Sequence, residues 1–586
     1  MEKMNIYRII RYLCVWLFVF LFMPSLMAQT EGEEYNEKVV VISGYQPVLQ
    51  ESEKINVSPK ITDTSNLSPE FKYQIHPLRI YSLFSPGEIQ AARLVGEPSM
   101  KLYKSYIKAG MGSYFTPLVD LYFNSTKSTS LNYSARIYHN SSWWSLEDYG
   151  SNWFSKTSVD LFGKYIWNKT FLSANVFYKN DYNLYYGFSD STLNLIYPEV
   201  SRDQLSKSDY SQVYNHVGSK IDFGTMSHDK LFYKTELKIE NLSDHYGFNE
   251  LHFALGGDIN YGFDWFGKDK QKLGLKVDWD IYNNGYDTLY PYSYIGNTQN
   301  IDSSSLIYNM LKIHPYFKIK ISGFDLDLGM SMFVTTRDTF EIIPYITLCQ
   351  QFMNGAFDVR LGVVGDVDRN SWQSLRMDNP YIGPNAEISN TSYYSYFLET
   401  DFAVMNNMDL GFGISYRTYD NAPIFMIDST YILNNVYKPI YVDYNLLQVG
   451  AKFNYRLSED LNVGLAANYY NYDLSENSQI GEVLYKPNFD LNLNALYSYG
   501  DKLKFSLNAL VLGNMNGLYF ANSQACYEKM PLKYGIDLKV EYQYMRALSF
   551  FVTFDNVAFQ RYFYWTNYPS QKFRFLLGFT YTIPTL

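Results

Sequence analysis

Histidine and acidic residues have the greatest capacity for catalysis in this sequence, but their spacing matches no known catalytic motif. The seven histidines are His76, His139, His216, His228, His245, His252 and His314, and none has a zinc-protease spacing such as H-E-x-x-H. A hydrolase also needs a Ser or Asp held beside a His, and nothing in the spacing demands such a pair. Phosphate-binding and dinucleotide-binding glycine motifs are absent as well. We therefore expect no catalytic residue, no metal site and no cofactor.

Charged and polar residues instead recur at every second position of several segments. In LHFALGGDINYGF (Leu251–Phe263) and KYGIDLKVEYQY (Lys533–Tyr544), one face is polar and the other apolar, and Leu447–Arg456 repeats the pattern. The polar faces carry His252, Asp258, Asn260, Lys452, Arg456, Lys533, Asp537, Lys539 and Glu541. Opposite charges on one strand face favour ladders that line an interior, and a histidine that lines the lumen is the plain interpretation of His252.

Alternation of this kind requires β-strands, and three features favour a membrane barrel over a soluble β-sandwich. The expected strands are about 10 to 14 residues long, whereas soluble strands average about five or six. Several apolar faces end in Tyr or Phe, as membrane-interface girdles do. The pattern also continues almost to the C-terminus without a break between domains of soluble size. We therefore predict an all-β fold, a transmembrane antiparallel β-barrel over residues 101–586.

Composition and the N-terminus agree with export to a membrane. Lys3, Arg8 and Arg11 precede a twelve-residue apolar run, Tyr12–Met23, and PSLMA follows, so residues 1–28 are predicted to be a signal peptide. Aromatic residues make up 18% of the chain, including 58 Tyr and 40 Phe. The net charge of −10 argues against a nucleic-acid partner. Cys349 and Cys526, the cysteines beyond the signal, suggest neither a disulfide framework nor a metal site.

Short turns and longer connections alternate along the predicted barrel, as they do in outer-membrane barrels. The predicted short turns lie near residues 125–126, 168–169, 228–229, 267–268, 323–324, 354–355, 406–407, 458–459, 500–501 and 545–546. With terminal strands near 101–111 and 571–583, they give about 22 strands, an even number that places both termini on the periplasmic side. The longer segments include 366–390, 418–443 and 558–570; we expect a solvated rim there, with inward folding or ligand binding as the alternative. Trp372 and Tyr381 are the apolar anchors noted in them.

The C-terminal stretch FVTFDNVAFQRYFYWTNYPSQKFRFLLGFTY (Phe551–Tyr581) resembles the end of TonB-dependent receptor barrels of Bacteroidota. Those barrels close with an Asn-containing penultimate strand, an aromatic Arg-Tyr segment, a Pro-containing turn and a final F-x-F-x-x-G strand. The matching residues are Asp555, Asn556, Arg561, Tyr562, Pro569, Phe573, Phe575 and Gly578. The resemblance implies an outer-membrane barrel of 22 strands, in agreement with the turn count.

The segment VVVISGY near the N-terminus resembles the V-V-V-x-G-Y stretch around the box with which those receptors contact TonB. Val39, Val40, Val41, Ile42, Gly44 and Tyr45 supply it, with one extra residue before the glycine and Gln46 where a glycine is common. The family also places a plug domain between this box and the barrel. Here only Ser52–Met100 is available, which is Pro-rich and too short for a plug. We expect residues 29–100 to be a mostly irregular periplasmic or lumenal segment that partly occludes the barrel.

The interpretation is an outer-membrane transport protein of a Gram-negative bacterium that moves or binds a solute. Its expected partners are outer-membrane lipids and the barrel-assembly machinery, and TonB and a surface lipoprotein or periplasmic protein remain to be tested. One alternative is a barrel that transports nothing and scaffolds a surface or periplasmic complex. An outer-membrane enzyme is the other alternative.

Overall fold

The computed structural model describes residues 103–584 apart from 126–127, 129, 227–229, 266–270, 287–290, 295–296, 301–305, 322, 337–339, 384–386, 432, 477, 479 and 522–523. The predicted signal peptide at 1–28, the VVVISGY strand and the expected occluding segment lie outside the described residues.

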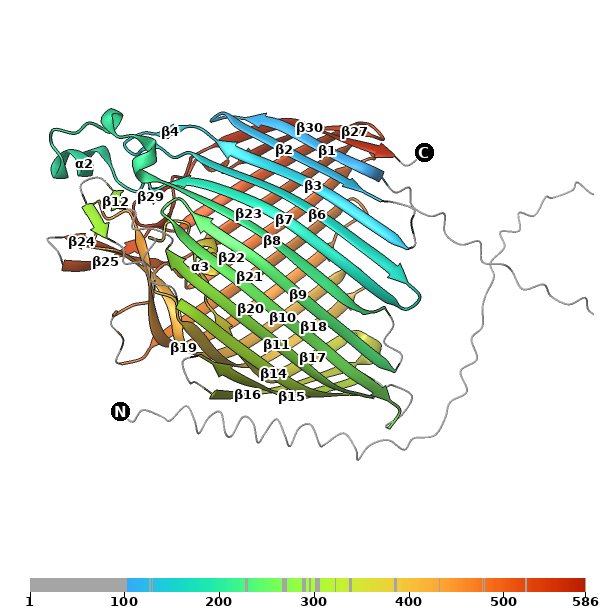
Figure 1. The fold of residues 1–586 in the computed structure, drawn as a ribbon. Helices are drawn as coiled ribbons and strands as arrows, with labels where there is room; N and C mark the ends of the chain where they lie inside the picture. Colours follow the sequence, from blue (N-terminus) through green and yellow to red (C-terminus); the bar gives the residue numbers. More distant parts are fainter. Residues whose placement is uncertain are drawn as a thin grey trace, which may run out of the picture. The chain divides into compact units, whose positions relative to one another are not determined.

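The described chain forms one antiparallel sheet of 22 strands, in which each strand pairs with the strands before and after it in the ring (Figure 1). The strands are β1 (Tyr103–Gly112), β2 (Thr116–Asn124), β3 (Leu131–Ser142), β6 (Phe154–Trp167), β7 (Thr170–Leu184), β8 (Ser211–Thr225), β9 (Leu231–Asp244), β10 (Phe248–Phe263), β11 (Gln271–Tyr286), β14 (Leu306–Ile321), β15 (Phe324–Thr335), β16 (Phe340–Phe352), β17 (Phe357–Arg369), β18 (Asn390–Met405), β19 (Met408–Ile427), β20 (Tyr437–Arg456), β21 (Leu461–Leu474), β22 (Phe489–Tyr499), β23 (Leu503–Leu512), β26 (Lys533–Met545), β27 (Leu548–Asp555) and β30 (Arg574–Pro584). The predicted fold class and strand number are confirmed.

The sheet closes on itself where β1 pairs with β30 in an antiparallel register that includes Ala109 opposite Phe579 and Gly110 opposite Gly578. The same register places Tyr103 opposite Pro584. The start of β1 and the last residue of β30 therefore both lie at the end of the barrel that carries the short turns. Closure leaves no unpaired strand edge in the wall, which is the condition for a sheet to cross a bilayer.

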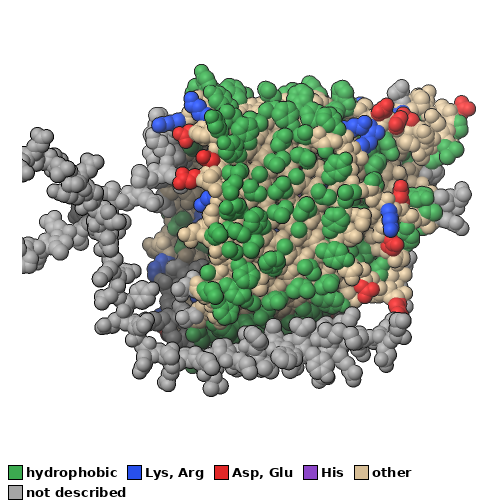
Figure 2. Space-filling view, turned by 180° about the vertical axis from the view of Figure 1, so that it is seen from behind, with side chains coloured by type: hydrophobic (Ala, Val, Ile, Leu, Met, Phe, Trp, Pro, Cys, Tyr) green, Lys and Arg blue, Asp and Glu red, His purple; other side chains and the backbone are tan. Residues whose placement is uncertain are grey.

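Alternation along the strands separates an apolar outer face from a polar inner face. On β10, the side chains of Leu251, Leu255 and Ile259 are 43%, 44% and 50% exposed, while those of His252 and Asn260 on the other face are 5% and 8% exposed. A band of apolar side chains covers the outer wall in Figure 2, and charged side chains gather toward its two ends. A period of two therefore supplies a surface suited to lipid and, on its other face, a polar interior.

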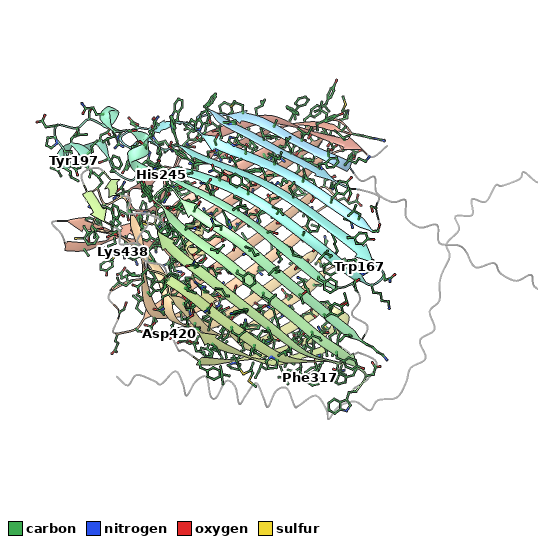
Figure 3. All side chains as sticks on the ribbon, in the orientation of Figure 1. Trp167, Tyr197, His245, Phe317, Asp420 and Lys438 are labelled. Carbon is green, nitrogen blue, oxygen red and sulfur yellow. The ribbon has the colours of Figure 1, made fainter. Side chains whose placement is uncertain are left out.

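The two ends of the barrel differ in their connections. The ten predicted short turns all fall between paired strands, and Trp167 and Phe317 lie toward that end in Figure 3. The other end carries Tyr197, His245 and Lys438, and its connections contain the remaining elements. These are β4 (Ser145–Leu146), β5 (Gly150–Ser151), α2 (Asp190–Ile196), η2 (Arg202–Gln204), η3 (Lys207–Tyr210), β12 (Pro291–Tyr294), β13 (Asn297–Asn300), α3 (Trp372–Asp378), β24 (Met515–Ala521), β25 (Gln524–Met530), β28 (Phe563–Trp565) and β29 (Tyr568–Pro569). A further short helix, η4 (Met353–Gly355), lies in a short turn. Within the described part of the chain, every helix is too short or too polar to cross a membrane.

One predicted connection is longer than the connection in the structure. Residues 418–443 were expected to be loop, but β19 continues to Ile427 and β20 begins at Tyr437, so each strand has 20 residues. The register shifts between Tyr419 and Ala422, where Asn421 adopts a positive φ of 59°. Beyond this bulge, the burial pattern changes from alternating to mostly buried. A bulge bends a strand and redirects its side chains, which explains why alternation alone did not reveal this extension.

The closure seam provides a test of the fold. A Cβ on Gly578 would lie 2.3 Å from the Ala109 carbonyl oxygen and 2.8 Å from the Gly110 Cα, so Gly578→Val should obstruct the pairing of β1 with β30. We expect this variant to lose the heat-modifiable band of a folded barrel on electrophoresis. Gly257→Val is the matched control, because a Cβ there meets no atom within 4 Å. Equal folding of both variants would contradict the described seam.

Candidate transport lumen and its loop cap

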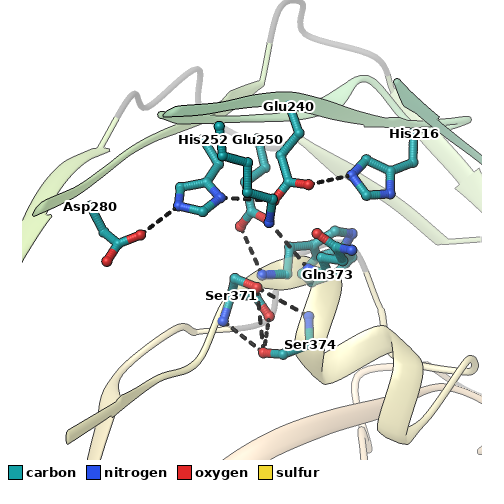
Figure 4. Close-up of polar contacts among 10 residues, drawn as sticks. His216, Glu240, Glu250, His252, Asp280, Ser371, Gln373 and Ser374 are labelled. Atoms are coloured by element: carbon teal, nitrogen blue, oxygen red, sulfur yellow. Dashed lines mark hydrogen bonds and ion pairs between the residues drawn. The ribbon is translucent and has the colours of Figure 1, made fainter. Parts of the chain in front are cut away.

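A ladder of buried charges runs across the inner faces of four adjacent strands (Figure 4). His252 on β10 lies between two carboxylates: its Nδ1 is 2.8 Å from Glu240 Oε1, and its Nε2 is 2.8 Å from Asp280 Oδ1. Both ring nitrogens can donate at once only in the doubly protonated imidazolium. Glu240 makes two further polar contacts: its Oε2 is 3.1 Å from His216 Nε2, and its Oε1 is 2.5 Å from Lys238 Nζ. The predicted residue His252 thus belongs to an ion-pair ladder that joins β8 to β11.

Asp258 and Asn260, on the same face of β10, share one tyrosine of β14. The Tyr316 hydroxyl donates to Asp258 Oδ1 at 2.8 Å and accepts from Asn260 Nδ2 at 3.0 Å. This bridge spans β11, since β10 and β14 each pair with it. Both residues therefore cross-link the wall from its inner face.

The four predicted residues of β26 divide into two groups. Lys539 pairs with Glu541 at 2.7 Å, and Ser549 on β27 donates to the same carboxylate at 2.8 Å. Lys533 instead places its ammonium over the rings of Tyr564 and Tyr562, 2.9 Å and 4.3 Å from their centroids. Asp537 accepts a hydrogen bond from the backbone of Asn556 at 2.8 Å. Lys533 and Asp537 thus connect β26 to the long connection between β27 and β30.

Lys452 and Arg456 on β20 border hollows in the inner wall. Lys452, with Cys349 and Arg417, lines a hollow of about 970 Å³ against β15 to β21. Arg456 lines a second hollow of about 660 Å³ near the short turn between β18 and β19. The nine predicted polar residues therefore occupy several separate positions on the inner faces, and the structure does not gather them into one site.

The long connections meet in a shared hydrophobic core, which we call the loop cap: residues 185–210, 370–389, 428–436 and 556–573. Its buried side chains include Tyr185, Phe188, Leu193, Trp372, Leu375, Ile382, Tyr431, Leu433, Val436 and Tyr568, together with Tyr437 of β20. These connections leave the ring at β7–β8, β17–β18, β19–β20 and β27–β30, which are separated around the barrel. Because loops from such distant positions pack on one another, the core spans the mouth. The expectation of a solvated rim is therefore wrong for these four connections.

Aromatic stacking and hydrogen bonds from side chains to backbone fix the centre of the cap. Tyr381 stacks on Tyr568 with ring centroids 3.5 Å apart. The Tyr185 hydroxyl donates to the Ile382 carbonyl at 2.8 Å, and the Tyr186 hydroxyl donates to the Pro569 carbonyl at 3.0 Å. Burial raises the pKa of the Tyr381 phenol to about 12, so this ring stays neutral at physiological pH.

Of the two anchors noted in the sequence, Trp372 is fully buried and Tyr381 forms the central stack; the other cap residues were missed. Short apolar runs in the connections were the available signal: LYYGF begins at Leu184, and FYW begins at Phe563. Glu250 and Arg376 were also missed. Their local sequence does not reveal their contacts with the cap, because their partners lie more than a hundred residues away.

Neither family models nor curated proteins yield a match to this sequence. The comparison with solved structures does yield matches. A ferric enterobactin receptor mutant from Pseudomonas aeruginosa in complex with enterobactin is similar at a TM-score of 0.62 and 12% identity, over 82% of each chain. The pyoverdine outer-membrane receptor of the same species, bound to pyoverdine, gives 0.60 and 12%, over 83% of this chain and 79% of that one. A complex of FpvAI with pyocin S2 gives a TM-score of 0.61 and 13% identity, over 82% of this chain and 73% of that one. At such identities the likeness shows the fold alone, a barrel like that of these outer-membrane receptors.

The two cysteine thiols provide a test of the cap. Cys349 lines the inner-wall hollow, whereas Cys526 lies on β25 in the long connection between β23 and β26. A bulky thiol reagent added outside cells is expected to label Cys526 and to spare Cys349. Tyr568→Ala, which removes the central stack, should allow Cys349 to be labelled, and Phe559→Ala, at a 60% exposed ring of the same loop, should not. Equal labelling of both cysteines in the unaltered chain would contradict a cap that spans the mouth.

Proposed function

We propose that this chain is an outer-membrane transport barrel that resembles TonB-dependent receptors and binds or moves a solute. One observation carries the proposal: a closed sheet with an apolar outer band has a charged inner face and a loop core across one mouth. A polar interior closed at one end suits a protein that admits selected solutes, whereas an open porin needs no such core.

In this proposal the inner faces line the path of the solute. His252, Asp258, Asn260, Lys533, Asp537, Lys539 and Glu541 hold the wall and the cap together through the contacts described above. Lys452 and Arg456 border hollows where a solute has room. The groups that line the path are therefore mostly paired, so the lumen carries both charges without a strong preference for either.

The N-terminal part of the proposal concerns the periplasm. Tyr103 and Pro584 lie at the short-turn end, and short turns face the periplasm in outer-membrane barrels, which supports placing both termini there. Val39, Val40, Val41, Ile42, Gly44 and Tyr45 would then form an extended strand able to pair with the sheet edge of TonB. The solutes to test first are ferric enterobactin and ferric pyoverdine, because the similar receptors bind enterobactin and pyoverdine.

Deleting residues 37–45 is expected to abolish uptake while leaving the barrel assembled, because the strand that pairs with TonB is lost and the wall is untouched. The measurement is uptake of the two ferric compounds by cells in which this chain is the sole receptor. Deletion of residues 60–68, also nine residues of the N-terminal segment, is the matched control and should retain uptake. Normal uptake without residues 37–45 would remove the TonB role.

The loop cap also favours a second candidate, a scaffold that transports nothing, since a spanned mouth would suit a barrel whose loops hold a partner. Purification in gentle detergent separates the two. A stoichiometric surface or periplasmic partner together with no uptake would support the scaffold.

A further inference from the structure

We propose that residues 371–379, which include α3, form a movable lid within the loop cap, and that Glu250 is the latch that holds it closed. The inference rests on the proposed transport function for its purpose, because a lid has a role only where a solute passes. Its structural basis is independent of that function and is given by the contacts of α3 alone.

The latch is a buried carboxylate at the first turn of α3 (Figure 4). Glu250, on the inner face of β10, is 3% exposed. Its Oε2 accepts from the Trp372 backbone N–H at 2.8 Å, and its Oε1 accepts from that of Gln373 at 3.3 Å. The first N–H groups of a helix lack partners within the helix and carry a partial positive charge, so a carboxylate satisfies them well.

A second tie holds the other end of α3 to the wall. Arg376 pairs with Asp181 of β7 at 3.0 Å, and its guanidinium lies 4.6 Å from the centroid of the Tyr214 ring. Both ties are polar contacts between side chains or between a side chain and the helix terminus. They can break and re-form without dismantling the sheet.

In the closed position, α3 and the residue that follows it bury polar groups, which costs free energy. Trp372 Nε1, Arg376 Nε and Asn379 Nδ2 are buried donors without a hydrogen-bond partner. Elsewhere in the described chain, no stretch of eight residues holds three unpartnered buried polar atoms. A buried donor without a partner loses its bonds to water and gains nothing in return, and exposure restores them. The closed lid is therefore opposed by its own donors. The latch offsets part of this opposition, together with the burial of Trp372 and Leu375 in the cap core.

Fixed points bound the lid on both sides. On one side, Asn370 Nδ2 donates to the Ser389 carbonyl and to Thr391 Oγ1, both at 2.8 Å. On the other, Tyr381 and Gly383 exchange backbone hydrogen bonds with Tyr437 of β20, at 2.9 Å and 2.7 Å. Movement of residues 371–379 therefore leaves the flanking hydrogen bonds of Asn370, Tyr381 and Gly383 in place.

Hydrogen–deuterium exchange of the reconstituted full chain tests the lid without any solute. Peptides that cover 371–379 are expected to exchange faster than those that cover 437–444, although both stretches are largely buried. Glu250→Ala should accelerate exchange in 371–379 at least about tenfold, because charge-assisted hydrogen bonds are lost.

The control for the latch is Glu399→Ala, which removes an inner-wall carboxylate that pairs with Arg360 at 2.9 Å on β17 and β18. Exchange in 371–379 that is the same in Glu250→Ala and Glu399→Ala would overturn the lid. Unchanged exchange in 437–444 shows that each variant keeps its barrel. Uptake reports on the transport function separately: a lid that exchanges as expected in a chain without uptake would leave the lid standing and remove the function.

Discussion

The backbone of a strand in lipid has no water to bond, so every N–H and C=O of the wall must find a partner within the sheet. The pairing of β1 with β30 meets this constraint, since it joins the ends of the 22-strand ring. Closure requires residues without side-chain volume at one point of the seam, where Gly110 lies opposite Gly578. It also places the start of β1 beside the end of β30, at the end of the barrel that carries the short turns.

Closure determines the chemistry of the inside. Since the outer faces serve the lipid, all charge within the strands has to lie on the inner faces, where it is stabilised as ladders such as His216–Glu240–His252–Asp280. The long connections carry aromatic side chains at the mouth of the barrel. These side chains pack against one another and are buried from water. The polar wall and the apolar cap meet at Glu250 and Asp181, which receive α3. The proposed latch therefore lies where the two kinds of packing join.

Sequence periodicity predicted the wall because it is a local property: Leu251 to Phe263 alternates residue by residue, and turn residues such as Gly323 and Gly500 mark the short ends. The cap escaped prediction because its contacts are distant in sequence. Tyr186 meets Pro569, and Glu250 meets Trp372, at separations that no local pattern encodes. The bulge at Asn421 likewise interrupts the alternation, so that the part of β19 beyond it was predicted to be a loop. Polar inner-face positions followed from alternation, whereas their partners depended on strand register and on the cap.

The central claim is that a loop core closes one mouth of the polar lumen that the described strands enclose. Single-channel conductance of the purified full chain in planar bilayers tests it most directly, with a chain in which Ala replaces Tyr381, Tyr437 and Tyr568 as the comparison. The account predicts a largely non-conducting full chain and large, stable openings once the stacked centre is removed. Large openings in the full chain, or silence in both proteins, would contradict it.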